Sequence, residues 1–213
     1  MAMMEDAPLD VGKWSEAYLV VHAFRQRWPR PLNKVGMGLR SMASTATGGT
    51  AKVSQRLKRF ERIIDKLRRF PRKNLAQMQD IGGCRVVVPT LADLEAVRAR
   101  IQKWWSGAIE DEYDYVKEPK VSGYRAVHVV VKREDHLVEI QLRTRRQHRW
   151  AASVEFVEQR QGGWLRDTDD AHTLTSAFRD LGLGFELLDR GEPVPPDLQA
   201  KLKRWLSILD VGE

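Results

Sequence analysis

The sequence predicts a mixed α/β (α+β) fold. A short apolar run at residues 84–88 reads as a buried strand, and a helical pattern follows it directly. Three more strand-like segments lie between residues 110 and 143, and the last two are separated by only a few residues, as in a hairpin. A strand–helix unit followed by a hairpin points to a sheet covered by helices.

The bulk composition fits one domain of ordinary size with additions at its ends. The chain has 213 residues, a hydrophobic fraction of 42% and a net charge of +7. The charge favours anionic partners such as nucleotides, nucleic acid or an acidic membrane, although a basic protein without such a partner is the alternative. The single cysteine, Cys84, excludes an intramolecular disulfide and suits a reducing cytosol. With no signal-peptide pattern and no apolar run of membrane-spanning length, we expect a cytoplasmic protein without a membrane partner.

The N-terminal third predicts helices and a linker. Residues 13–28 have the pattern of an amphipathic helix stopped by Pro29, and residues 31–44 that of a second helix. The small residues of STATGGT, 44–50, predict a mobile linker. Segment 54–70 is densely basic, and its apolar residues are at helical spacing, so a third helix is predicted there.

The middle of the chain predicts the sheet and the end predicts helices. After strand 84–88, Thr90 is placed to cap a helix over 91–105. Strands are predicted at 110–116, 124–132 and 137–143, the last two joined through Arg133–His136. From residue 144 the pattern is helical, with turns near Gly162-Gly163 and the prolines of 193–196. Helices around 170–189 and 197–209 are expected to pack on the core or on a second subunit.

Strand alternation predicts a polar patch on one face of this sheet. In 137–143, Glu139 and Gln141 share a face opposite an apolar one. Aligning the apolar faces of the hairpin puts Tyr124 and His128 on the same surface as Glu139.

A second carboxylate, Asp80, precedes strand 84–88, beside Gly82 and Gly83, which permit tight backbone or close approach of a ligand. Magnesium commonly takes one or two carboxylates with waters and phosphate oxygens, so Asp80 and Glu139 are candidate magnesium ligands. The alternative is that Asp80 caps a turn and Glu139 pairs with a surface arginine.

Basic residues gather in three places around this patch. On a helix, Lys58, Arg62, Lys66 and Arg69 would share one face, which suits a triphosphate but also an ordinary solvated face. A second cluster, RTRRQHRW at 143–150, follows the Glu139 strand. In the loop 117–128, basic residues around a glycine can cradle phosphate, and Tyr124 can stack on a base. The sequence contains neither a Walker motif nor G-x-G-x-x-G.

From Arg56 to Trp150 the chain resembles the synthetase domain of the RelA/SpoT family of alarmone synthetases. The resemblance is carried by RLKRFERIIDKLRR, QDIGGCRVVV, DYVKEPKVSGYRAVHVVV and VEIQLRTRRQHRWA, in that order and spacing. It implies a nucleotidyltransferase-like synthetase domain, with a mixed, mainly antiparallel sheet of about five strands flanked by helices. The expected division is a helical N-terminal extension and linker (1–50), the synthetase core (51–160) and a helical C-terminal extension (161–213).

The resemblance also implies residue roles. Arg56 and Arg85 would sandwich the adenine of ATP, while the phosphates would be held by Lys58, Lys66 and Arg69. Asp80 and Glu139 would bind Mg²⁺, and Glu139 would assist deprotonation of the attacking 3′-hydroxyl. Tyr124 would stack on the acceptor base, and the acceptor phosphate or ribose would be positioned by Lys120, His128 and Gln141.

The implied activity is transfer of pyrophosphate from ATP to the ribose 3′-hydroxyl of GDP or GTP, which makes (p)ppGpp. A toxin of the same family would instead modify the 3′ CCA end of tRNA, and a third alternative is an inert nucleotide- or RNA-binding module. The expected partners are therefore these nucleotides or tRNA, with a homo-oligomer or a cognate antitoxin as protein partner. The chain departs from the family at Arg62, often a serine, and at Glu155-Phe156, often Glu-His.

Overall fold

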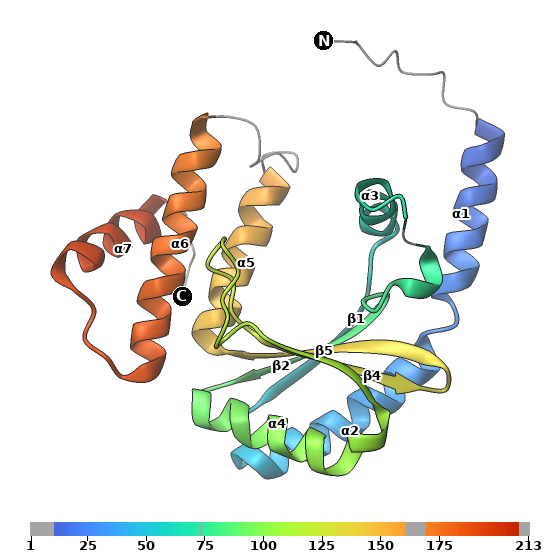
Figure 1. Cartoon of the computed structure of the whole chain (residues 1–213), viewed down its shortest axis with the longest axis horizontal. Helices are drawn as coiled ribbons and strands as arrows, with labels where there is room; N and C mark the ends of the chain where they lie inside the picture. The colour runs from blue at the N-terminus through green and yellow to red at the C-terminus, as the bar shows by residue number, and fades with distance from the viewer. Residues whose placement is uncertain (1–10, 73, 161–168, 209–213) are drawn as a thin grey trace.

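The computed structural model describes residues 11–72, 74–160 and 169–208. Its centre is a five-stranded sheet in the order β1-β2-β5-β4-β3 (Figure 1). The strands are β1 (Lys52–Leu57), β2 (Gly82–Val88), β3 (Ile109–Asp114), β4 (Val127–Arg133) and β5 (His136–Thr144). Only β2 and β5 pair in parallel, and the other three pairs are antiparallel. The predicted mixed, mainly antiparallel sheet is thus confirmed.

Helices cover both faces of this sheet. Helices α2 (Pro29–Thr47) and α4 (Leu91–Trp105) lie under one face, and α3 (Phe60–Arg69) and α5 (Arg145–Arg160) stand over the other (Figure 1). Helix α1 (Val11–Arg25) precedes α2, and two short 3-10 helices, Leu75–Gln77 and Ser106–Ala108, complete the sheet domain. None of the helices in the described ranges is long and apolar enough to cross a membrane.

The main core lies between the sheet and helices α2 and α4. Val138, Ile140 and Leu142 of β5 are at most 1% exposed in it, as the strand alternation predicted. Leu39 of α2 and Ile101 of α4 are fully buried against the same cluster. Helix α2 therefore belongs to the packed core, although the predicted boundary at residue 50 falls just after it.

A second core joins α5 to two C-terminal helices, α6 (Asp169–Arg190) and α7 (Pro196–Ile208). Trp150 of α5, Phe178 and Leu181 of α6 and Leu198 of α7 are buried together. The two predicted C-terminal helices are therefore present: α6 packs on α5, and α7 packs on α6. The turn predicted near Gly162-Gly163 lies outside the described residues.

Local signals account for two connections. Thr90 caps α4 through a capping box, in which its hydroxyl accepts from the Asp93 amide at 3.1 Å. Glu134 and Asp135 join β4 to β5 with positive φ values of 49° and 60°, as the tight primed hairpin turns require. Both predictions are confirmed.

The basic segment 54–70 was wrongly predicted as one helix. Residues Lys52–Leu57 form the edge strand β1, which pairs with β2, and α3 begins only at Phe60. The apolar helical spacing begins at Phe60, and alternate residues of β1 are half-buried in the manner of an edge strand. The physical reason is strand pairing. Residues of β1 form backbone hydrogen bonds with the otherwise open edge of β2, and the local spacing of apolar residues does not predict such long-range pairing.

Two N-terminal predictions also need correction. STATGGT is not a linker, because α2 continues to Thr47, whose hydroxyl donates to the Ala43 carbonyl at 2.8 Å. Gly48, at a φ of 59°, is the left-handed cap that ends this helix. Helix α1 ends at Arg25 and is not clearly amphipathic, because Leu19 and Val20 are well exposed beside buried Val21.

Gly82 allows α1, α2 and the sheet to meet. Trp28, between the two helices, is 4% exposed, and its indole N–H donates to the Leu137 carbonyl at 2.9 Å. A Cβ on Gly82 would lie 2.3 Å from the Trp28 ring. Gly82 is therefore required by the packing of Trp28.

We predict that Gly82→Ala lowers the free energy of unfolding by about 1–3 kcal/mol, because the indole must shift and lose its hydrogen bond. Urea denaturation measures this. Gly107→Ala is the control, since a Cβ there meets nothing within 4 Å. Equal stability of the two variants would contradict the packing argument.

Candidate functional site

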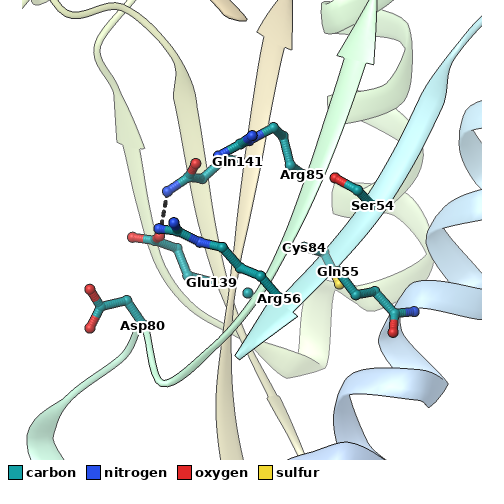
Figure 2. A pocket seen from close by; sticks show the side chains of 9 residues that line it. Ser54, Gln55, Arg56, Asp80, Cys84, Arg85, Glu139 and Gln141 are labelled. Atoms are coloured by element: carbon teal, nitrogen blue, oxygen red, sulfur yellow. Dashed lines mark hydrogen bonds between the residues drawn. The ribbon is translucent and has the colours of Figure 1, made fainter. Parts of the chain in front are cut away.

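The parallel pairing of β2 with β5 brings the two predicted carboxylates together. Gly83 pairs with Glu139, and Asp80 lies in the connection just before β2. Both carboxylates line two adjoining cavities of about 230 Å³ and 800 Å³. Figure 2 shows them on the same side of the sheet, with Arg56 across from them.

Asp80 is held by two lysines from different elements. Lys58 follows β1 and lies 2.7 Å from Asp80 Oδ2, and Lys66 of α3 lies 2.9 Å from Oδ1. Burial alone would raise the pKa of Asp80, but the charges and hydrogen bonds of Lys58 and Lys66 outweigh it and hold the pKa below its usual value. Asp80 is therefore ionised at neutral pH.

Glu139 of β5 accepts hydrogen bonds on both oxygens. His128 Nδ1 lies 3.1 Å from Oε1, and Gln141 Nε2 lies 2.7 Å from Oε2, the bond drawn in Figure 2. Burial acts to raise the pKa of Glu139, but His128 and Gln141 overcome it and the pKa is lowered. The charge of Asp80 opposes this lowering, in keeping with two carboxylates facing one space.

These contacts exclude the alternative that Asp80 caps a turn and that Glu139 pairs with an arginine on the surface. The Asp80 and Glu139 side chains are only 17% and 18% exposed, and their partners are lysines, a histidine and an amide inside the site.

A closed ring of hydrogen bonds supports Glu139. The Tyr124 hydroxyl lies 2.5 Å from His128 Nε2 and accepts from Arg143 Nη2 at 2.8 Å. The same Arg143 nitrogen donates to Gln141 Oε1 at 2.8 Å. With a neutral His128, Tyr124 donates to Nε2 and Nδ1–H donates to Glu139. Arg143, 4% exposed, thus supports both hydrogen-bond paths to the carboxylate.

The sequence placed Arg143 in the basic cluster 143–150 but predicted no role for it in the site. The strand alternation that identified Glu139 and Gln141 puts Arg143 on the same face, and that signal was sufficient to find it.

The predicted cations surround the carboxylates, though not on one helix. Arg56 is on β1, Arg85 on β2, and Lys66 and Arg69 on α3, so the predicted single face running from Lys58 to Arg69 is wrong. Arg56 lines both carboxylate cavities and a third of about 380 Å³, which Lys58, Arg62 and Arg69 also line. The cations therefore converge by tertiary packing.

The remaining predicted residues form an aromatic wall of the larger cavity. Lys120 Nζ lies 4.4 Å from the ring centroid of Tyr115 and 5.2 Å from that of Tyr124. Tyr115 meets His128 edge-on at a centroid distance of 5.2 Å. Tyr113 and Tyr115, one strand period apart, were missed, although their alternation in EDEYDYV was a usable signal.

Helix α6 closes the far side of this cavity. Thr175 and Phe178 line it together with Trp150, whose indole N–H donates to the Phe178 carbonyl at 2.7 Å. The loop before β4 is tied to the same helix by the Arg125–Glu186 ion pair.

The donor set fits a hard divalent cation that keeps other ligands. The described residues contain no group of three or more histidine, cysteine, aspartate or glutamate side chains suited to a metal. Two ionised carboxylates on one cavity match the need of Mg²⁺, which takes the rest of its ligands from water and phosphate. Asp80 would take part by exchanging a lysine contact for the cation.

A pH-dependent test follows from the Asp80 ion pairs. We predict that Asp80→Asn lowers the free energy of unfolding at pH 7 by about 2 kcal/mol, because two partly buried lysines lose their charged partner. Since the folded pKa of Asp80 is depressed, its contribution is fully present above the usual value of 3.8 and is lost as pH falls through the folded pKa.

Urea unfolding of both proteins between pH 7 and pH 3 measures the effect, and the difference should narrow only at the acidic end. A difference that is constant over the whole range, or absent at pH 7, would show that the two ion pairs do not stabilise the fold.

The fold and the site together define an α+β domain with a carboxylate pair surrounded by cations. Residues 55–157 match the family described as "Region found in RelA / SpoT proteins". GTP pyrophosphokinase YjbM of Bacillus subtilis is 36% identical over 109 residues, which are 46% of this chain and 52% of the relative. An uncharacterized protein of Mycobacterium tuberculosis is 33% identical over 159 residues, 75% of this chain and 58% of the relative.

Solved structures agree on the fold. Small alarmone synthetase 1 from Bacillus subtilis, bound to its product pppGpp, aligns with a TM-score of 0.63 at 21% identity over 84% of this chain and 96% of that one. Small alarmone synthetase 2 of the same organism aligns at 0.61 and 22% identity, over 82% and 93% of the two chains.

Residues 55–157 of this chain thus match the RelA/SpoT family model, and the chain has the fold of the solved small alarmone synthetases. The chain spans little more than half the length of the curated relatives named above.

Proposed function

We propose that this protein transfers the β,γ-pyrophosphate of ATP to the ribose 3′-hydroxyl of GDP or GTP, making (p)ppGpp. The main support is the ionised pair Asp80 and Glu139, which faces two adjoining cavities lined by cations from β1, β2 and α3. Further support is the similarity to GTP pyrophosphokinase YjbM across this region.

Each nucleotide has a defined place in this proposal. ATP lies between Arg56 and Arg85, with its phosphates toward Lys58, Lys66 and Arg69, where the tertiary fold concentrates positive charge. The acceptor lies in the larger cavity, whose aromatic wall includes Tyr124 and where Lys120, His128 and Gln141 can contact its ribose or phosphate.

The chain's own groups carry out alignment and charge stabilisation. The acceptor 3′-oxygen attacks the β-phosphorus, the bond from that phosphorus to the α–β bridging oxygen breaks, and AMP leaves. Glu139, fixed on both oxygens, takes up the hydroxyl proton in the low-exposure site. Lys66 neutralises charge that develops on the phosphates. Mg²⁺ held by Asp80 and Glu139 would supply further charge neutralisation when bound.

We predict that Glu139→Gln lowers kcat by about 10²–10⁴-fold, because an amide cannot accept the proton. Pyrophosphate transfer by purified protein is measured with magnesium and γ-labelled ATP. Glu110→Gln, at an exposed position of β3, is the control and should keep full activity. Unchanged activity in Glu139→Gln would rule out its role as the base, and the absence of transfer by the unaltered protein to GDP, GTP and tRNA alike would favour the inert binding module.

A second acceptor, the 3′ end of tRNA, is favoured by one observation. Several arginines and lysines beyond the proposed nucleotide ligands are exposed along β1, α3 and the segment after it, among them Lys52, Arg59, Arg68 and Arg72. Such a surface would bind an RNA backbone by neutralising phosphates. A toxin of this kind would arrest growth and need a cognate antitoxin.

The acceptor is decided by offering GDP, GTP and deacylated tRNA in separate reactions with γ-labelled ATP. We expect label in the guanosine nucleotide. Label in tRNA alone would instead establish the translation-blocking alternative. In that case Arg59→Ala together with Arg72→Ala should weaken labelling and reduce its salt dependence.

A further inference from the structure

We infer that Glu155 is a specificity-determining residue that selects adenine over guanine in the donor nucleotide. The inference rests on the proposed ATP site. It assigns hydrogen bonding with the edge of the donor base to a side chain that was not among the predicted ligands. Glu155 lies on α5, on the opposite side of the site from α3.

One oxygen of Glu155 spans the two arginines proposed to hold the donor base. Glu155 Oε1 lies 4.0 Å from Arg56 Nη1 and 3.9 Å from Arg85 Nη2. Because the same atom makes both contacts, the two guanidinium nitrogens lie within about 8 Å of each other. A planar base stacked between two guanidinium groups needs a separation of about 7 Å, two van der Waals contacts. This separation lies within the upper limit of about 8 Å that the two contacts set.

Charge explains why an acid belongs at this place. Arg56 and Arg85 repel each other, and the pKa of Arg85 is lowered by burial and by the charges of Arg143 and Arg56, an effect that Glu155 opposes. Both contacts are long for an ion pair, and the Glu155 side chain is 48% exposed. The carboxylate therefore lies near both guanidinium groups and can still accept a hydrogen bond from a bound base.

A carboxylate in this position distinguishes the two purines. When ionised it can only accept hydrogen bonds. In this inference it faces the 6-position of the base, where the 6-amino group of adenine donates to it and the 6-carbonyl oxygen of guanine presents an acceptor to an acceptor. Guanine would have to turn its N1–H and 2-amino edge toward the carboxylate in order to donate. Stacking between arginines binds either base, so the discrimination must come from a group at the base edge. A base that donates to the carboxylate therefore binds more tightly than one that leaves it unpaired, and the difference is large where solvent access is reduced.

Glu155→Gln tests this, because glutamine keeps the shape of the side chain and replaces one acceptor oxygen with an amide donor. The Glu155→Gln amide can accept from adenine or donate to guanine, so it should relax the preference. We expect the unaltered protein to bind the α,β-methylene analogue of ATP at least tenfold more tightly than that of GTP by calorimetry. In Glu155→Gln the ratio should fall to about threefold or less, mainly through tighter binding of the guanine analogue. Glu192→Gln, an exposed position after α6, should leave the ratio unchanged.

Because the α–β bridge of these analogues cannot be cleaved, the measurement needs no acceptor and no turnover. A preserved tenfold ratio in Glu155→Gln, or an equal loss of affinity for both analogues, would overturn the inference and leave Glu155 as a charge partner of the two arginines. An adenine preference that depends on Glu155, in a protein that transfers no pyrophosphate, would separate this inference from the proposed reaction.

Discussion

The site depends on the parallel register between β2 and β5. This pairing, Gly83 with Glu139, places Glu139 beside the connection that carries Asp80, where two of the five described strands pair in parallel. A shift of one residue would turn Glu139 toward the core and send Ile140 into the cavity. The buried apolar face of β5 prevents that shift, so burial of Val138, Ile140 and Leu142 is what holds the Glu139 face toward the cavities.

Around that register, the fold supplies charge from separate elements. Lys58 after β1 and Lys66 on α3 reach Asp80, while His128 on β4 and Gln141 on β5 reach Glu139. Each carboxylate is ionised because its partners outweigh burial. The two are nevertheless held differently: Asp80 by cations, and Glu139 by groups that fix its direction. That difference suits a phosphate-side group and a proton acceptor, respectively.

Much of the sheet and half of the site could be read from the sequence. Strand alternation found Glu139, Gln141 and His128, because period-two patterns survive as long as one face is buried. It failed for β1, since an edge strand that leads into a basic stretch has a weak pattern and is fixed by pairing with β2. The contacts of Arg143 and Glu155 depend on tertiary packing, which brings their guanidinium and carboxylate groups to partners far away in the chain. No local propensity encodes such distances.

The hydrogen bond from Trp150 to the Phe178 carbonyl fixes the C-terminal helix α6 against the sheet domain. The matched family region ends at residue 157, before α6 begins, yet Thr175 and Phe178 of that helix form part of the wall of the larger cavity. The matched region alone would keep every proposed nucleotide ligand but lose one side of the larger cavity. Chains that differ after this boundary can therefore share the carboxylate pair and differ in the width of that cavity.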